Sequence, residues 1–211
     1  MSFLTSLFPQ KIKTFFKKFR KFNALNEIDK KMLNYINYEK GFYIECGAND
    51  GVDQSNTYYY EKFLNWNGIL IEPLDNKFVE LKKNRSNKNI FINSALVASE
   101  DTQNINIFED NLKSKITSHN EENNERIIKV KATTLSKILT ENKAPSIIDF
   151  FSLDVEGYED EVLKGIDFNR YKFKFFLIET SNTKIFEVLK KNNYKLLKKI
   201  SNGDYLFQFN F

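Results

Sequence analysis

Several residue types are scarce in this chain of 211 residues, and each scarcity excludes a class of structure. A single cysteine, Cys46, excludes a disulfide within the chain and suits a reducing compartment. The single histidine, His119, leaves no histidine pair at metal-ligand spacing, so we expect no metal site. Apolar runs stay well below the roughly 20 residues of a membrane span. Residues 1–8 lack the length and preceding basic region of a signal peptide, so we expect a cytoplasmic location.

Acidic residues are scarce only in the first part of the chain. Residues 1–40 carry nine Lys or Arg against three Asp or Glu, whereas the remaining residues carry 23 against 25. Within this part, residues 11–22 would form a helix with one apolar stripe surrounded by cations; the stripe comprises Ile12, Phe15, Phe16, Phe19 and Phe22. Such a helix can lie on an anionic membrane surface or an acidic protein, or dock its stripe on the folded domain. We therefore divide the chain into a basic, aromatic helical extension (1–40) and one domain (41–211).

An acidic, glycine-bracketed turn follows the first apolar run of that domain. Residues 42–44 are typical of a buried strand, and residues 45–51 read Glu-Cys-Gly-Ala-Asn-Asp-Gly. Ser55 is then placed to cap a helix. Strand, glycine turn and helix form the first unit of a nucleotide-binding α/β fold, but the three glycines of a dinucleotide site are absent. Because Glu45 and Asp50 would repel a pyrophosphate and attract a cation, the turn indicates a cationic nucleotide, S-adenosylmethionine (SAM).

A second carboxylate supports a nucleotide site. Residues 68–73 read Gly-Ile-Leu-Ile-Glu-Pro, so Glu72 ends an apolar run about one helix after the turn. An acidic residue at the tip of the second strand accepts hydrogen bonds from both ribose hydroxyls. Each piece alone is ordinary, since glycine pairs and strand-end glutamates are common. Their order and spacing favour a cofactor site.

The rest of the pattern alternates strands with helices. We expect helices at 28–38, 76–84, 134–139 (capped by Thr133), 158–163 and 185–191, and strands at 90–97, 105–108, 127–132, 146–153, 173–178, 195–200 and 204–209. This alternation predicts an α/β fold with a doubly wound, mostly parallel sheet and a C-terminal antiparallel hairpin. Residues 109–126 are polar and too long for an ordinary connection, and are either a functional loop or a disordered one.

A second dense motif, residues 151–159, reads Phe-Ser-Leu-Asp-Val-Glu-Gly-Tyr-Glu. It places Asp154 and Glu156 at the carboxyl end of the expected central strand, where doubly wound sheets bind ligands. We expect both to meet Glu45 and Glu72 in one crevice, with Glu179 at its rim. The alternative is a capping cluster at the start of the following helix, which would explain Glu159 but not Asp154.

These motifs together resemble the FkbM-type SAM-dependent methyltransferases. The resemblance covers about residues 41–179 and is carried by residues 45–51, 55–57, 66–73, 93–96, 153–159 and 162–165. It implies a class I, Rossmann-like methyltransferase fold with a seven-stranded sheet and SAM as the methyl donor. The cofactor-binding residues that we infer are Glu45, Gly47, Ala48, Asn49, Asp50, Gly51, Ser55, Glu72, Pro73, Ser94, Ala95 and Asp154. One departure is Ser136, where the family pattern would place Asp.

The resemblance also implies an acceptor, a hydroxyl on a sugar, glycan or small metabolite. Such a hydroxyl needs a base, for which Asp154 and Glu156 come first and Glu179 third. His119 is a further candidate base, although a lone histidine in a polar loop is more often a solvated surface residue. Nucleic acid is not expected, because acidic residues after the central strand would repel its backbone. The alternative to an enzyme is a membrane-surface or scaffold protein that keeps a degenerate nucleotide fold.

Overall fold

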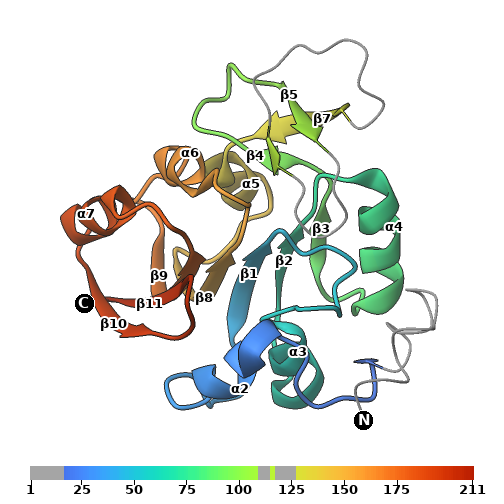
Figure 1. The fold of residues 1–211 in the computed structure, drawn as a ribbon, viewed down its shortest axis with the longest axis vertical. Coiled ribbons are helices and arrows are strands. Elements are labelled where there is room, and N and C mark those ends of the chain that lie inside the picture. Colours follow the sequence, from blue (N-terminus) through green and yellow to red (C-terminus); the bar gives the residue numbers. More distant parts are fainter. Residues whose placement is uncertain (1–16, 109–114, 117–126) are drawn as a thin grey trace.

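The computed structural model describes residues 17–108, 115–116 and 127–211 (Figure 1). Its helices are η2 (Leu25–Glu27, a 3-10 helix), α2 (Ile28–Met32), α3 (Tyr58–Leu64), α4 (Asp75–Asn84), α5 (Leu135–Glu141), α6 (Glu159–Lys164) and α7 (Lys184–Lys191). Its strands are β1 (Phe42–Cys46), β2 (Asn67–Ile71), β3 (Ile90–Ile92), β4 (Ala95–Leu96), β5 (Asn104–Phe108), β6 (Lys115–Ile116), β7 (Ile127–Thr133), β8 (Ile147–Leu153), β9 (Lys172–Glu179), β10 (Tyr194–Lys199) and β11 (Asp204–Phe209). Among the described residues, no helix combines the length and apolar character that a bilayer crossing requires.

The main sheet has seven strands in the order β10-β11-β9-β8-β1-β2-β3. The pairs β9–β8, β8–β1, β1–β2 and β2–β3 are parallel, whereas β11 is antiparallel to both β9 and β10. This confirms the expected doubly wound α/β sheet with a closing antiparallel hairpin. The strand order reverses beside β1 and β8, which is where ligands bind in such sheets.

Alternation along the strands supplies two apolar cores, one on each face of this sheet. Phe151 and Leu153 point to the core that α5, α6 and α7 cover, whereas Phe150 points to the core beneath α2, α3 and α4. Figure 1 shows the strands lying between α5–α7 on one side and α2 and α3 on the other. Because both faces are covered, the strands read as continuous apolar runs.

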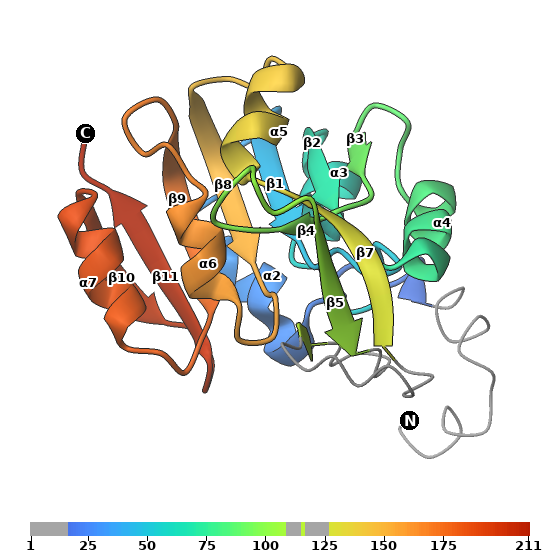
Figure 2. The ribbon, with the colours of Figure 1, turned by 90° about the horizontal axis from the view of Figure 1, so that it is seen from above.

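The expected strand over residues 90–97 is corrected to two strands in two sheets. β3 pairs with β2 in the main sheet, but β4 pairs with β7 in a second sheet of order β4-β7-β5-β6. The second sheet lies above the main one in Figure 1 and in front of it in Figure 2. The chain turns between them because Asn93 donates from Nδ2 to the backbone oxygens of Glu72 and Pro73, each at 3.1 Å. Ser94 donates from Oγ to the oxygen of Lys131 at 3.1 Å, which ties the turn to β7.

Two expected helix boundaries also move. The helix expected over 28–38 ends at Met32, although Ile36 beyond it is still fully buried with Ile28 and Met32 in the core beneath α2. The cap of α5 is Thr134 instead of Thr133, because the Thr134 hydroxyl accepts the Lys137 N–H at 3.2 Å while Thr133 belongs to β7.

Residues 11–16 of the expected helix over 11–22 lie outside the described residues, as does His119. The helix is wrong for residues 18–22, which form a turn, a bend and irregular chain. From residue 17 onward the chain runs along the domain. Ala24 forms a parallel bridge with Gln54, and the Phe22 ring stacks on Tyr59 with ring centroids 5.0 Å apart. Lys17 forms an ion pair with Asp53.

Candidate active site

A cavity opens at the carboxyl ends of β1, β2 and β8, where the topology predicted a ligand site. The site residues expected from the sequence that line it are Glu45, Gly47, Ala48, Asn49, Ser55, Glu72, Pro73, Ser94, Ala95, Asp154 and Glu156. Asp50, Gly51 and Glu179 are not part of this lining, and His119 lies outside the described residues. The residues that complete the wall, which sequence reasoning did not single out, are Cys46, Asp53, Gln54, Asn56, Leu74, Lys77, Leu96, Ile107, Ser152, Val155 and Tyr158.

Gly47 allows the ends of β1 and β8 to approach closely. Its φ is +79°, and a Cβ built there would lie 2.0 Å from the backbone oxygen of Asp154. Asp50 shapes the same turn, since its Oδ1 accepts the N–H groups of Val52 and Asp53 at 2.9 and 2.8 Å. Asp50 therefore organises the backbone that forms the cavity wall.

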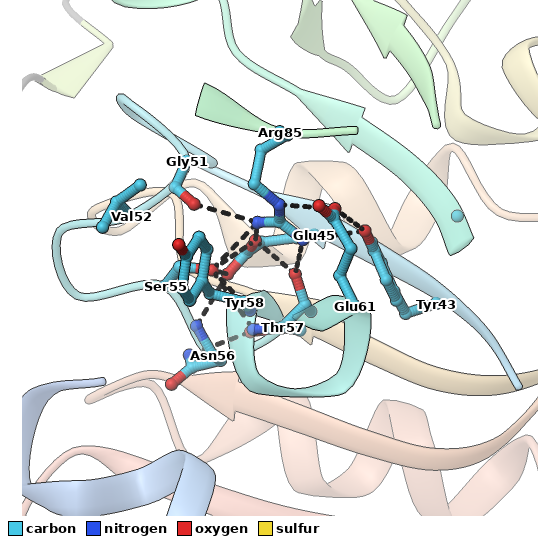
Figure 3. Close-up of polar contacts among 12 residues, drawn as sticks. Tyr43, Glu45, Gly51, Val52, Ser55, Asn56, Thr57, Tyr58, Glu61 and Arg85 are labelled. Carbon is cyan, nitrogen blue, oxygen red and sulfur yellow. Dashed lines mark hydrogen bonds and ion pairs between the residues drawn. The ribbon is translucent and has the colours of Figure 1, made fainter. Parts of the chain in front are cut away.

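A buried arginine, Arg85, fixes the turn from behind (Figure 3). Its Nη1 donates to the Gly51 oxygen at 3.1 Å and lies 3.2 Å from Oε2 of Glu45. Its Nη2 donates to the Tyr43 hydroxyl at 2.7 Å, and its Nε donates to Oε2 of Glu61 at 2.7 Å. Although burial alone would raise the pKa of Glu61, its pKa lies below the ordinary value because Arg85 stabilises the ionised form.

Glu45 belongs to this network as well as to the cavity wall. Its carboxylate accepts the Asn56 N–H at 2.8 Å, the Thr57 hydroxyl at 2.6 Å and the Ser55 hydroxyl at 2.9 Å, in addition to Arg85 (Figure 3). Glu45 is thus paired with a cation of the protein itself, which it shares with Glu61. The attraction for a cationic ligand that the sequence suggested for Glu45 passes to other carboxylates of the cavity.

Ser55 has a role that the sequence expectation gave only in part. Its hydroxyl oxygen accepts the Tyr58 N–H at 3.0 Å, at the first residue of α3, while the hydroxyl donates to Glu45. Ser55 therefore connects the start of α3 to the end of β1 and holds the two elements that flank the turn.

Glu72 is the buried carboxylate at the end of β2. Its Oε2 accepts the Asn49 N–H at 2.8 Å, and its Oε1 accepts the Leu74 N–H at 3.0 Å. Burial raises its pKa to about 7, despite these two hydrogen bonds and the nearby Lys77. A carboxylate held in this way keeps free lone pairs on both oxygens, which suits the two adjacent hydroxyls of a ribose.

An acidic group surrounds the end of β8. Asp154 is hydrogen-bonded to Glu179 at the end of β9, and burial followed by the charge of Glu179 raises the pKa of Asp154 well above its ordinary value. Asp204 lies directly opposite Glu179 in the β9–β11 ladder and is buried, and its own pKa is raised by that burial. Asp204 was missed from the sequence, where it reads as the ordinary start of a hairpin strand.

Glu156 and Glu159 separate into two roles. Glu156 has φ +52°, precedes Gly157 at φ +98°, and lines the cavity. Glu159 accepts the Gly157 N–H at 2.8 Å in front of α6, so the capping alternative describes Glu159. Asp154, at the strand end, lies outside that cap.

The balance of charge makes the cavity suited to a cation. Glu45 is paired with Arg85, which it shares with Glu61, and Asp53 is paired with Lys17. Of the remaining lining residues, Glu72, Asp154 and Glu156 are acidic and Lys77 is basic. The residues present thus fit SAM, whose sulfonium is positive and whose ribose offers two hydroxyls. Glu72 would hold the ribose, and the turn at Gly47–Asn49 would hold the methionine part.

Comparisons with known proteins identify the family of the chain and the likeness of its fold. A model of the family described as "Methyltransferase FkbM domain" matches residues 45–206. The crystal structure of methyltransferase FkbM from Methylobacillus flagellatus KT has a TM-score of 0.52 at 13% identity, over 83% of this chain and 45% of that one. This chain therefore spans less than half the length of that protein.

The METTL16 MTase domain has a TM-score of 0.50 at 11% identity, over 87% of this chain and 64% of that one. At these identities the likeness concerns the fold. Among curated proteins none matches. The family model covers most of the chain, including the acidic turn, Glu72 and the residues after β8. The chain therefore belongs to the FkbM family of SAM-dependent methyltransferases.

Proposed function

We propose that this methyltransferase transfers the methyl group of SAM to a hydroxyl of a carbohydrate or a small metabolite. The observation that carries the proposal is the hydrogen-bonded carboxyl pair of Asp154 and Glu179 at the end of the central strands. SAM, when bound, supplies an electrophilic methyl group. A hydroxyl acceptor must lose its proton during transfer, so it needs a base beside the methyl group, and a carboxylate of raised pKa is a stronger base than an ordinary one.

The position of each carboxyl group determines which part of the proton transfer it can perform. Asp154 lies in the cavity wall and Glu179 behind it, so a proton taken up at Asp154 can pass along the pair. Glu156 lies in the wall two residues further on and is a second group that can receive the acceptor's proton. Holding donor and acceptor in line supplies much of the acceleration, so the rigid Gly47 junction between β1 and β8 contributes by positioning.

Nucleic acid is disfavoured as the acceptor by the same group of side chains. A phosphate backbone that approached the cavity would meet Asp154, Glu156 and Glu179. Like charges at this distance oppose binding, and proteins that bind nucleic acid place Lys and Arg along the path of the backbone. A neutral polyol meets no such repulsion, and its hydroxyls can donate hydrogen bonds to the carboxylates.

The test is transfer of a labelled methyl group from SAM to a panel of glycans, free sugars and small hydroxyl compounds, with an RNA and a protein extract as comparison acceptors. We expect label in an alkali-stable methyl ether of a hydroxyl compound, and loss of at least 100-fold in kcat for Asp154→Asn with SAM affinity changed much less. If the labelled methyl group were found on nitrogen atoms or in RNA instead of on hydroxyl oxygens, the proposal would be overturned. Glu187→Gln, an exposed change on α7, is the matched control.

A further inference from the structure

A ladder of three aromatic rings joins the N-terminal segment to α3. Phe22 stacks on Tyr59 at 5.0 Å between ring centroids and 18° between planes, and Tyr59 stacks on Phe63 at 5.1 Å and 28°. Tyr59 is buried within the ladder, while Phe63 at its end is 50% exposed. Residues 17–25 and α3 therefore form one continuous surface.

Several large apolar side chains of this surface are exposed to solvent. Phe19 is 76% exposed and Leu25 is 52% exposed on the N-terminal segment, which Phe22 joins to the half-exposed Phe63 through Tyr59. We call the surface formed by Phe19, Phe22, Leu25, Tyr59 and Phe63 the aromatic surface. Exposed apolar groups gathered in this way mark interaction sites more often than isolated ones do.

Cations surround the aromatic surface. The Lys21 ammonium lies 5.6 Å from the ring centroid of Phe22 and 5.8 Å from that of Tyr59, and the Lys30 ammonium lies 6.0 Å from Phe22. Lys62 lies 5.5 Å from the ring of Tyr58 on α3. Lys18 and Arg20 are also exposed on this segment, and Glu27 is paired with Lys30. The local charge is therefore strongly positive.

We propose that the aromatic surface binds the surface of an anionic lipid bilayer. Aromatic rings favour the boundary between headgroups and acyl chains, and lysine stems can extend along apolar area while the ammonium reaches lipid phosphates. The cations are mostly lysines, which suit a diffuse field of anionic headgroups, whereas arginine forks suit the fixed phosphates of a nucleic acid or the carboxylates of an acidic protein.

The sequence left open whether the basic stripe docks on the domain or binds a membrane or an acidic protein, and the structure shows docking for one of its residues. Phe22 docks on the domain through Tyr59, whereas Phe19 stays exposed. The proposal is independent of the acceptor, because it needs only the exposed rings and their cations.

The same segment also contacts the wall of the cofactor cavity. Lys17 pairs with Asp53 and Ala24 bridges Gln54, and both partners line the cavity. A bilayer bound at the aromatic surface would therefore lie beside this wall. That arrangement would favour an acceptor that is itself carried on a lipid.

The experiment is flotation of the full-length chain with vesicles of phosphatidylcholine alone and of phosphatidylcholine with 30% phosphatidylglycerol. We expect binding to the anionic vesicles that weakens as salt rises. The variant Lys18→Gln, Lys21→Gln, Lys62→Gln should bind about 100-fold more weakly, at about fivefold for each cation. The variant Phe19→Ser, Phe63→Ser should lose at least about tenfold.

A matched control comes from β10, whose Leu196 is 47% exposed among the exposed Lys195, Lys198 and Lys199. The variant Lys195→Gln, Lys198→Gln, Lys199→Gln should float like the unaltered chain, and every variant should keep its SAM affinity, which reports on folding. Equal loss in the β10 variant, equal binding to neutral vesicles, or no flotation of the unaltered chain would overturn the proposal. Self-association that disappears in Phe19→Ser, Phe63→Ser would also overturn it, since the surface would then belong to a second copy.

Discussion

At Glu72, we expect folding and the binding of SAM to favour opposite protonation states. Its pKa is raised from 4.5 to about 7 because the carboxylate is buried. The folded state therefore binds this proton more tightly than the unfolded state does. The resulting stability is fully present below about pH 4.5 and is lost as pH rises through 7. Above pH 7 the ionised carboxylate costs the free chain up to about 3 kcal/mol.

We expect Glu72→Gln to stabilise the SAM-free protein at pH 8 by up to about 3 kcal/mol and to change little at pH 5. Gln resembles the protonated side chain, so it removes the cost of burying a charge. Urea unfolding at the two pH values measures the effect, with the exposed Glu187→Gln as a control that should be neutral at both. If Glu72→Gln lowered the free energy of unfolding at pH 8, the buried charge of Glu72 would not destabilise the folded protein.

The same substitution should weaken SAM binding by about tenfold or more, since an ionised carboxylate makes stronger hydrogen bonds to hydroxyls than an amide does. For the unaltered chain, affinity for SAM should rise with pH through about 7, as Glu72 ionises. Calorimetry between pH 5.5 and 8.5 measures this. A pH dependence that persists in Glu72→Gln would assign the titration to another group.

Arg85 is a residue whose burial and partners could not be predicted from the sequence. The sequence marked Glu45 because it precedes a glycine turn, but its partner lies 40 positions later, at the end of α4. A lone arginine in a lysine-rich helix carries no sign that it will be buried. Local pattern predicts the element to which a residue belongs, whereas partners across elements depend on packing that a single sequence does not display.

Arg85→Lys should cost about 3 kcal/mol of unfolding free energy, because one ammonium cannot replace donors that reach both Glu45 and Glu61. Arg170→Lys is the matched control. Arg170 is exposed, lies over the Tyr171 ring at 5.1 Å and donates to Thr140, so its replacement should cost less than about 1 kcal/mol. Chemical unfolding measures both, and equal costs would show that the network around Arg85 contributes little.

At the level of elements, two glycines separate backbone strain from steric contact. Gly47 and Gly157 both have positive φ, +79° and +98°. An added Cβ would lie 2.0 Å from the Asp154 oxygen at Gly47, and would meet nothing within 4 Å at Gly157. Gly157→Ala should thus cost only backbone strain, about 1–2 kcal/mol.

Gly47→Ala should cost more than Gly157→Ala, about 3 kcal/mol or above, because it also forces the ends of β1 and β8 apart. SAM affinity should fall at least tenfold in Gly47→Ala and little in Gly157→Ala. Thermal unfolding and calorimetry on the same preparations measure the two effects. Similar SAM affinities in the two variants would show that the junction tolerates displacement.

The elements themselves were largely predictable, for a physical reason. Strands buried on both faces, such as residues 147–153, read as continuous apolar runs whose only partner requirement is burial. The single strand predicted over residues 90–97 was wrong because the apolar residues on both sides of Asn93 and Ser94 read as one strand with a polar interruption. The side-chain bonds from Asn93 and Ser94 to neighbouring backbone, which divide it between two sheets, depend on Glu72 and Lys131 being nearby.

At the scale of the whole molecule, charge is separated into two regions. Cations gather around the aromatic surface, and the carboxyl groups of Glu72, Asp154 and Glu156 line the cavity. Arg85 and Lys17 pair with Glu45 and Asp53, which leaves Glu72, Asp154 and Glu156 to set the field inside. The composition alone shows a modest net charge of +4 and does not predict this separation.

This field should distinguish the donor from its demethylated product. SAM carries a sulfonium, whereas S-adenosylhomocysteine has a neutral sulfur and otherwise offers the same groups. Since Asp154 and Glu156 line the cavity, we expect SAM to bind several-fold more tightly than the product at pH 8. Glu156→Gln should reduce this ratio by lowering the affinity for SAM alone. Competition calorimetry measures both, and an unchanged ratio in Glu156→Gln would mean that its charge does not reach the sulfur. A cavity that favours the cation also releases the neutral product more readily, so the charge that recruits the donor would speed turnover.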